Sequence, residues 1–497
     1  MKHFLDSVHG TINIPQEYCD KIIDTCYFQR LRRIEQNSCR SVFPSARHDR
    51  FIHSIGVFHL GSLIVENIKN KCKTNLPENN EVIFTTYKMA CLLHDIGHTP
   101  FSHTFEEYFN LEEVEKSLKR ELNDKAFNID TNKNEKAAHH EAISAYLSVK
   151  VFRDTLLEFG VDLVLLARMI TGYKYFEGEK PISSFENAMI ELIHGDIIDA
   201  DGLDYVCRDV WAGGYKNFSI DLNRLINSIE IIGDQNKEYK VVYSSKALNE
   251  IETVLNIKNF QYIYVIKHHK VLLEQYILVE AMKSAACYHL QLPSGTMDER
   301  DNALRTLCDF NMFFTPKILP ESNYKICRPV DDDFVALMKQ YDLDNKYISQ
   351  WFSRQYETTP LWKSKMEYFN TFSSVFKTLS EDSIMHMNTL LTSDECKHFL
   401  CTMFNLAEDD IIIINVKPKY RKLNEKKINI KLHNIIKPYS DLSHDMFSII
   451  GKEISFCYIY VNTKTIDKED IHNHKKEIIS KLKDFLINGL RDKWNKS

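Results

Sequence analysis

The chain has 497 residues, of which 44% are hydrophobic and 27% are charged. This composition is ordinary for a soluble globular protein, and the length is too great for one compact core, so we expect two or three lobes. The net charge of -6 is mild, so nucleic acid stays open as a partner but nothing in the composition indicates it.

Cysteine use and hydropathy bear on the compartment. The 12 cysteines form no C-x-x-C pair, and the sequence shows no signal peptide. We therefore expect reduced thiols and a cytoplasmic protein. No apolar run approaches the length that crosses a bilayer, so we expect no membrane partner.

The first predicted elements carry clustered positive charge. After a short strand over 11–14, we expect a helix from Glu17 to about Asp24 and a second helix from about Thr25 to Gln36. Residues 30–33 of the second helix include three arginines. They would form either a solvated face or a surface that contacts phosphate or another subunit.

A polar loop then leads into a third helix. Apolar residues recur at a helical period from Ile55 to Ile68, so this helix should start close to His53. His53 would then face the core at the helix start. Arg50 lies just ahead of it, where it could hold an anion beside the histidine.

The most informative stretch follows a run that is apolar nearly all round, from Val82 to Leu93, which predicts a buried helix. A nearby glycine and proline should end this helix and turn the chain out of the core. Polar side chains there must be paired or bind a metal. A hydrogen-bonded turn would explain a single histidine, whereas this stretch favours a metal-centred site. Its polar residues are His94, Asp95, His98 and His103.

Downstream, a further helix is expected from Phe105, and the charged segment 111–136 should form a mobile excursion. His139, His140 and Glu141 open a helix over 142–151. Two histidines at a helix start are weak evidence for a site, because they could equally cap the helix.

The segment 201–209 is rich in aspartate. Asp201, Tyr205 and Asp209 are spaced four residues apart, so a helix would place them on one face. Asp201 could then bind a metal while Tyr205 and Asp209 line the cavity below it. A calcium loop would also need a closing glutamate, which is missing here.

The remaining pattern predicts the fold class, which is mainly α. Long helices over 246–290 and further helices to about residue 380 would complete a helical core over 1–380. A small α+β lobe without a catalytic signature should follow over 381–497. Its predicted elements are strands over 411–416, 428–432 and 456–461 and an amphipathic helix over about 467–490.

Together these pieces resemble the HD-domain phosphohydrolases, and among them the deoxynucleoside triphosphate (dNTP) triphosphohydrolases, over roughly residues 5–290. The resemblance implies an HD-domain helical core, with the motif segment over about 50–210, in a stand-alone, bacterial-type member without a sterile-alpha-motif domain. The matching segments are 28–32, 50–57, 94–103, 140–141 and 201–209.

The resemblance also assigns site residues by position. It implies a divalent metal cofactor, and the mixed nitrogen and oxygen ligands suit magnesium, manganese, iron or zinc alike. The implied metal ligands are His53, His94, Asp95 and Asp201, the catalytic residues are His98, His103, Glu106 and His140, and the residues around phosphate and deoxyribose are Arg50, Gln36, Tyr205 and Asp209.

The implied reaction is hydrolysis of a dNTP at its α-phosphorus, which yields a deoxynucleoside and inorganic triphosphate. His103, with its pKa raised by Glu106, would be the general acid, and Tyr205 would disfavour a sugar 2′-hydroxyl. The family's mammalian member has a lysine where Gly202 stands here, so one phosphate contact is expected to be missing.

Regulation and alternatives follow from the same resemblance. Asp24, Gln29 and Arg32 resemble part of the family's nucleotide-activator site, which lies between subunits and implies a homo-oligomer, either a dimer or a tetramer. One alternative is an HD enzyme that acts on another phosphate ester, such as a nucleoside monophosphate or a cyclic nucleotide. Another is an inert nucleotide or nucleic-acid binding module, although all four implied metal-ligand positions are kept.

Overall fold

The chain forms two compact units in a computed structural model. The first unit comprises Met1–Tyr262, Val279–Leu343 and Lys426–Leu442, and the second comprises Ile263–Leu278, Asp344–Glu425 and Ser443–Ser497. The predicted boundary at residues 380 and 381 lies outside the described residues and stays a prediction. The structure describes residues 1–37, 42–72, 76–122, 137–176, 183–195, 198–215, 219–233, 238–376, 387–416, 428–433, 435–441, 455–464 and 470–494.

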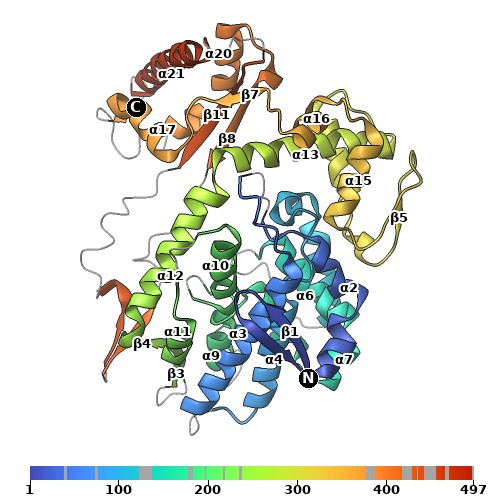
Figure 1. Ribbon diagram of the computed structural model, residues 1–497, viewed down its shortest axis with the longest axis vertical. Helices are drawn as coiled ribbons and strands as arrows, with labels where there is room; N and C mark the ends of the chain where they lie inside the picture. The colour runs from blue at the N-terminus through green and yellow to red at the C-terminus, as the bar shows by residue number, and fades with distance from the viewer. Residues whose placement is uncertain are drawn as a thin grey trace. The chain divides into compact units, whose positions relative to one another are not determined.

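Helices make up most of the first unit, so the predicted fold class, mainly α, is confirmed (Figure 1). The long helix α3 (Arg50–Lys71) packs against α4 (Asn80–Leu93) and α10 (Ala200–Ala212). Helix α4 in turn packs against α8 (Leu163–Thr171), which packs against α6 (His139–Val151). The ends of α3, α4, α6 and α10 carry the predicted site residues.

Side-chain caps determine where two of these helices begin. The Asp49 carboxylate accepts a hydrogen bond from the Ile52 backbone N–H over 3.0 Å at the start of α3. Asp199 accepts one from the Gly202 backbone N–H at the start of α10. Because a cap fixes the first helical turn, it also fixes the direction in which His53 and Asp201 leave the backbone.

The chain after α4 turns sharply instead of continuing as a helix. Phe101 and Ser102 adopt left-handed backbone conformations, with φ of 55° and 53°. The Phe101 backbone N–H donates to Asp331 Oδ1 over 2.6 Å, which holds the turn in place. Residues that are not glycine adopt such φ values only when their surroundings hold them there, as this hydrogen bond does.

The arginines at 30–33 divide between two environments. Arg30 is buried, and its guanidinium donates to the carbonyl oxygens of Ile96, His98 and Pro329. It therefore supports the backbone of the turn after α4, a role that the sequence interpretation did not include. Arg33 is exposed and pairs with Asp332.

The amino-terminal segment contains a hairpin and several short helices. The antiparallel strands β1 (Lys2–Asp6) and β2 (Gly10–Ile14) confirm the predicted strand at 11–14. The two helices predicted next are irregular, and the second ends before Gln36, whose backbone N–H donates to the His48 carbonyl oxygen over 3.0 Å. The elements are α1 (Gln16–Tyr18), the π-helix η1 (Cys19–Ile23), α2 (Cys26–Gln29) and the 3-10 helix η2 (Arg30–Arg33).

The expectation that residues 111–136 form a mobile excursion is wrong for residues 111–122, which form a helix. Helix α5 (Leu111–Leu122) buries Val114, Ser117 and Leu118 and packs against α6. Its charged residues lie on the opposite, solvated side, which is why the segment looked unstructured in composition. Residues 123–136 lie outside the described residues.

Strand pairing corrects one expectation about the carboxyl-terminal region. In the second unit, β11 (Phe456–Asn462) pairs with β8 (Ile411–Val416) and β7 (Thr358–Pro360), all antiparallel. The predicted strand over 428–432 also forms, as β9 (Asn429–Leu432), but it belongs to the first unit. It runs parallel to β4 (Tyr239–Ser244) and completes that strand's second edge, a long-range pairing that no local pattern reveals.

Other elements complete the two units. The predicted helices over 246–290 are α12 (Leu248–Phe260) and α13 (His269–Leu290), joined by the π-helix η7 (Gln261–Ile266). The rest of the first unit includes α7 (Arg153–Glu158), α9 (Ser183–Glu191), α11 (Leu222–Ser228), β3 (Ile229–Gly233), α14 (Met297–Leu307), β5 (Lys317–Ile318), β6 (Lys325–Ile326), α15 (Asp331–Tyr341) and β10 (Ile435–Pro438). The second unit also has α16 (Lys346–Ser353), α17 (Lys365–Thr371), α18 (Ser373–Phe376), α20 (Asp394–Phe404) and α21 (Ile471–Trp494).

Within the described residues, one helix is long and apolar enough to cross a membrane by length and composition, namely α3. The expectation that no apolar run reaches this length is therefore wrong. Of the apolar window in α3, 72% is buried inside the protein. A central core helix has the same character, so this single helix is weak evidence for a membrane span.

Candidate active site

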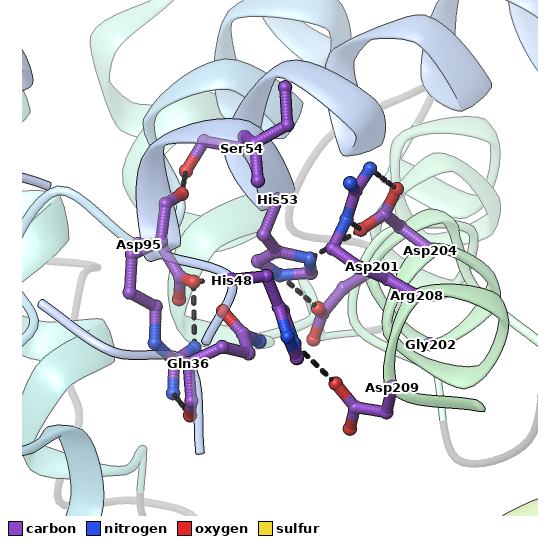
Figure 2. A network of polar contacts seen from close by, with 12 residues as sticks. Gln36, His48, His53, Ser54, Asp95, Asp201, Gly202, Asp204, Arg208 and Asp209 are labelled. Carbon is purple, nitrogen blue, oxygen red and sulfur yellow. Dashed lines mark hydrogen bonds and ion pairs between the residues drawn. The ribbon is translucent and has the colours of Figure 1, made fainter. Parts of the chain in front are cut away.

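Four predicted metal ligands meet at one point, and we call them the metal-ligand cluster. Asp201 Oδ1 lies 3.0 Å from His53 Nε2 and 3.6 Å from His94 Nε2. The carboxylate of Asp95 lies 3.5 Å from each of the same two nitrogens. The two Nε2 atoms are themselves 3.3 Å apart. Helix α3, the end of α4 and the start of α10 thus bring His53, His94, Asp95 and Asp201 together. Figure 2 shows three of these residues, His53, Asp95 and Asp201.

The hydrogen bonds of the two histidines show that the cluster suits a cation. His53 Nδ1 donates to Asp204 Oδ2 over 2.7 Å, and His94 Nδ1 donates to the Cys91 carbonyl oxygen over 3.0 Å. In each neutral ring the lone pair is therefore on Nε2, and the two lone pairs face each other. Two ligand atoms that each lie about 2.0–2.2 Å from one metal ion have a separation similar to that of these two Nε2 atoms. The residues therefore fit a divalent metal ion.

Electrostatics favour positive charge at the same place. Burial lowers the pKa of His53, but hydrogen bonds to Asp201 and Asp204 outweigh it and raise the pKa to about 10. Burial opposes ionisation of Asp201, yet its hydrogen bonds to His53 and His94 hold its pKa well below the usual range. The carboxylates thus attract a proton, or equally a metal ion, to the histidine nitrogens.

The Arg50 guanidinium donates hydrogen bonds to other protein groups. It is buried and donates from Nη1 to Asp95 Oδ2 over 2.8 Å. It also donates to Ser102 Oγ over 3.0 Å and to the Gln36 carbonyl oxygen over 3.2 Å. Burial raises the pKa of Asp95, but Arg50 and the neighbouring histidines hold it well below its usual range. Arg50 therefore orients a predicted metal ligand, Asp95, and the predicted contact between Arg50 and phosphate stays a prediction.

A second group of predicted catalytic residues surrounds one carboxylate, and we call it the Glu106 cluster. His103 Nδ1 lies 3.1 Å from Glu106 Oε1, and His140 Nδ1 lies 2.7 Å from Glu106 Oε2. Glu106 begins the 3-10 helix η4 (Glu106–Tyr108), His103 lies in η3 (Ser102–Thr104), and His140 is in the first turn of α6. Glu106 therefore holds each histidine by its Nδ1.

The protonation of the Glu106 cluster differs from the sequence expectation. Burial lowers the pKa of His140, but its hydrogen bond to Glu106 outweighs burial and raises it. For His103 the surrounding protein lowers the pKa more than Glu106 raises it. Its side chain is 58% exposed, so water moderates this shift. Glu106 does raise the pKa of His103, but burial outweighs this effect, so the expectation of a net raised pKa is wrong.

His98 connects the two clusters. Its Nε2 lies 3.1 Å from Asp95 Oδ1, and its ring stacks on that of His140 with centroids 4.0 Å apart. The side chain is fully buried, and burial together with Arg50 and His140 holds its pKa well below the usual range. Among the described residues, His98 Nδ1 has no hydrogen-bond partner. A neutral histidine thus lies between the metal-ligand and Glu106 clusters.

Two of the predicted sugar-contacting residues lie near a histidine that sequence reasoning missed. His48 Nε2 is 2.7 Å from Asp209 Oδ1, and its Nδ1 is buried without a hydrogen-bond partner among the described residues. Gln36 is buried, and its Oε1 likewise has no such partner. Figure 2 shows Gln36 and the His48–Asp209 pair near the metal ligands. Such unpaired buried atoms are consistent with polar groups that a ligand completes.

A lysine fills the space beside Gly202. A Cβ on Gly202 would collide with the amino group of Lys258, which comes from α12 and is buried. The same amino group lies 5.3 Å from the ring centroid of Tyr205. Positive charge is therefore present beside position 202, although the sequence comparison at that position alone suggested its loss.

The residues of the predicted nucleotide-activator site have ordinary partners. Asp24 pairs with Lys2 at 2.7 Å. Gln29 accepts a hydrogen bond from Arg32 Nε over 2.9 Å, and Arg32 stacks on the ring of Phe51. Gln29 and Arg32 thus lie in direct contact. The binding of a nucleotide activator by Asp24, Gln29 and Arg32 stays a prediction.

Comparison with known proteins identifies the central part of the chain. Residues 50–190 match the profile of a protein family described as the HD domain. A deoxynucleoside triphosphate triphosphohydrolase SAMHD1 homolog from Dictyostelium discoideum is 29% identical over 240 residues, or 46% of this chain and 40% of that protein. SAMHD1 from Gallus gallus is 27% identical over 303 residues, or 58% and 46%. The match therefore spans less than half the length of these two relatives.

Other relatives match more of the chain. The uncharacterised protein YwfO of Bacillus subtilis is 23% identical over 402 residues, which are 79% of this chain and 80% of that protein. A phosphohydrolase from Bacteroides thetaiotaomicron, known from its crystal structure, superimposes with a TM-score of 0.61 at 20% identity, covering 93% of this chain and 99% of that one. This structural likeness shows a shared fold. The chain thus contains an HD domain over residues 50–190 and, in the described residues, histidine and aspartate groups that could hold a metal ion.

Proposed function

We propose that this protein is a metal-dependent dNTP triphosphohydrolase, which cleaves a dNTP at its α-phosphorus into a deoxynucleoside and inorganic triphosphate. The observation that carries the proposal is that His98 joins the metal-ligand cluster to the Glu106 cluster, through Asp95 and His140. Hydrolysis of an ester with a poor leaving group benefits from both a cation and a proton donor. The relatives named as dNTP triphosphohydrolases support this substrate class.

The protein prepares the metal site before substrate arrives. When bound, a divalent metal would polarise a phosphate oxygen and activate a water molecule. Arg50 holds Asp95 in place, and Asp204 fixes the tautomer of His53, so both ligands are oriented in advance. Asp201 is 38% exposed at its side chain, which leaves this ligand accessible from solvent.

The Glu106 cluster would protonate the leaving 5′-oxygen. His103 is the exposed member, and its Nδ1 is held by Glu106, so its Nε2 can meet the substrate. The negative phosphates of a bound nucleotide would raise the pKa of His103, so that it takes up a proton and then donates it. The hydrogen bond to Glu106 raises the pKa of His140, which favours its protonated form, and this form would balance part of the phosphate charge.

Substrate selectivity would depend on residues around α10. Tyr205 would pack on the deoxyribose, and Gln36, His48 and Asp209 would contact its hydroxyl group. Lys258 would supply to the phosphates the positive charge that the family's mammalian member carries at position 202. A nucleotide activator and a homo-oligomer belong to the same proposal, through Asp24, Gln29 and Arg32.

A comparison of substrates tests the proposal against other phosphohydrolase activities. The protein is incubated with manganese or magnesium and, separately, with each dNTP, each deoxynucleoside monophosphate and a cyclic nucleotide. Inorganic triphosphate from dNTPs, absent in His94→Ala, is the expected result. Release of orthophosphate from monophosphates, or opening of the cyclic nucleotide without triphosphate formation, would favour another HD phosphohydrolase, since the metal-ligand cluster would serve those reactions equally.

A further inference from the structure

The β1–β2 hairpin directs two polar side chains into the protein beside the metal-ligand cluster. Asp6 ends β1 and is buried, and the His9 side chain in the following turn is 3% exposed. The His9 backbone N–H donates to Asp6 Oδ2 over 3.0 Å. Gly10 completes the turn with a φ of +74°, which favours glycine. The turn thus holds Asp6 and His9 as one rigid pair.

The partner of His9 is the carboxylate that orients a metal ligand. His9 Nε2 lies 2.6 Å from Asp204 Oδ1, across 195 residues of sequence. Oδ2 of the same carboxylate accepts the hydrogen bond from His53 Nδ1. Arg208 donates to both oxygens, from Nε to Oδ2 and from Nη2 to Oδ1, over 2.8 Å each. With these four contacts from three side chains, the buried Asp204 carboxylate has little freedom to rotate. Figure 2 shows Asp204 between His53 and Arg208.

Asp6 holds the other side of Arg208. Arg208 donates from Nη1 to Asp6 Oδ1 over 2.7 Å and from Nη2 to Asp6 Oδ2 over 3.1 Å. The planar guanidinium is therefore fixed between two carboxylates, one from the hairpin and one from α10. A continuous chain of contacts runs from Asp6 through Arg208 and Asp204 to His53.

Helix α3 is shaped to admit this arrangement. Gly56 lies three residues after His53, and a Cβ at Gly56 would lie 2.6 Å from Arg208 Nη2 and 2.8 Å from Asp204 Cγ. Any larger residue would push this pair away from α3 and lengthen the bond to His53. The approach of Asp204 to the metal ligand thus depends on a missing side chain in α3 as well as on the hairpin.

We infer that Asp6 and His9 are positioning residues for the metal, which hold Asp204 and Arg208 so that His53 presents Nε2 to the ion. This inference rests on the proposed metal site, and neither hairpin residue touches the ion. Loss of a partner that orients a ligand typically weakens metal binding by about 10- to 100-fold. The same order of effect is expected here, because Asp204 would lose one of its restraints.

The test measures Mn²⁺ affinity and folding separately. His9→Phe removes the contact to Asp204 while keeping a ring of similar volume, and His9→Gln restores a donor. Asp6→Asn weakens the hold on Arg208, and His3→Gln, at an exposed position of the same hairpin, is the matched control. The dissociation constant for Mn²⁺ is measured on the full chain by competition with a chelator, and thermal unfolding is followed without metal.

The expected result is a dissociation constant raised by about 10- to 100-fold in His9→Phe and Asp6→Asn. It should be restored to within a few-fold of wild type in His9→Gln and unchanged in His3→Gln. Lower thermal stability with a wild-type dissociation constant in the folded protein would overturn the inference, because the hairpin would then be structural alone. If Asp6→Asn does not fold, the His9 pair of variants decides the question.

Two further variants separate this inference from the proposed function. His53→Ala and His94→Ala remove predicted ligands directly. If these variants lose Mn²⁺ while His9→Phe binds it as wild type does, the hairpin inference fails and the metal site stands. If both ligand variants bind Mn²⁺ with wild-type affinity, the metal site itself is wrong, and the inference falls with it.

Discussion

His98 stacks on His140, with the two ring centroids 4.0 Å apart and the ring planes inclined by 17°. This stack places the metal-ligand cluster, which would hold a metal, next to the Glu106 cluster, which would move a proton. His98 stays neutral there, because burial and the positive charges of Arg50 and His140 lower its pKa. In the proposed function, a phosphate ester would therefore meet a cation on one side and a proton donor on the other.

The first prediction concerns metal content. His94→Ala and Asp95→Ala each remove a donor from the metal-ligand cluster, so the purified variants should contain far less metal than wild type. Elemental analysis of protein that is folded by circular dichroism measures this. His398→Ala, at an exposed position on α20, should keep the wild-type content. Wild-type metal content in both ligand variants would rule out the cluster as the metal site.

The second prediction concerns proton donation. His103→Ala should lower kcat by about 100- to 10,000-fold, the usual contribution of a general acid, while metal and dNTP binding persist. Glu106→Gln should lower kcat less and should move the falling alkaline limb of the pH–rate profile to lower pH. The value is taken per mole of metal-loaded, folded variant. A kcat for His103→Ala within about threefold of wild type would exclude His103 from the chemistry.

The third prediction concerns stability against pH. The raised pKa of His140 gives stability that is complete below the unfolded value of about 6.5 and is lost as pH rises through the folded value. The lowered pKa of Glu106 gives stability that is present above about 4.3 and is lost as pH falls. Glu106→Gln should therefore be most destabilising between these two pH values. Denaturant unfolding at pH 5.5 and pH 9 should show the smaller difference at pH 9.

The fourth prediction concerns Arg50. Replacing it with alanine leaves the buried Asp95 carboxylate without its cation, and breaking such a buried pair typically costs about 3–5 kcal/mol of unfolding free energy. The exposed pair Arg33–Asp332 provides the control, since Arg33→Ala should cost at most about 1 kcal/mol. If the two variants are equally stable in denaturant unfolding, Arg50 is not the structural partner of Asp95.

The fifth prediction concerns the sugar. If Tyr205 packs on the deoxyribose, GTP should be a poor substrate beside dGTP, because a buried ring leaves neither room nor a partner for the 2′-hydroxyl. Tyr205→Ala should reduce this discrimination, measured as the ratio of kcat/KM values. Comparable kcat/KM for GTP and dGTP in wild type, or an unchanged ratio in Tyr205→Ala, would remove Tyr205 from sugar selection.

Local patterns in the sequence were sufficient to predict the elements that carry the predicted metal ligands. The apolar run before His94 predicts a helix, and so does the spacing of four residues between Asp201, Tyr205 and Asp209. The structure has helices in both segments, α4 and α10. The convergence of His53 on these residues came from the family resemblance, and the structure shows it as distances between side chains.

Contacts between distant segments could not be predicted in this way. His9 meets Asp204 across 195 residues and His48 meets Asp209 across 161, and neither pair has a spacing that marks it. The pairing of β9 with β4 is of the same kind. The protonation of His103 and His140 also depends on a balance of burial against a shared carboxylate, which only the folded geometry reveals.

The most direct test of the proposed reaction locates the attacking oxygen. The protein is incubated with dGTP in water enriched in oxygen-18, and the products are separated and weighed by mass spectrometry. Attack at the α-phosphorus places one labelled oxygen in inorganic triphosphate and leaves the deoxynucleoside unlabelled, which is the result we predict. Label in orthophosphate, in pyrophosphate or in a deoxynucleoside phosphate would contradict a dNTP triphosphohydrolase.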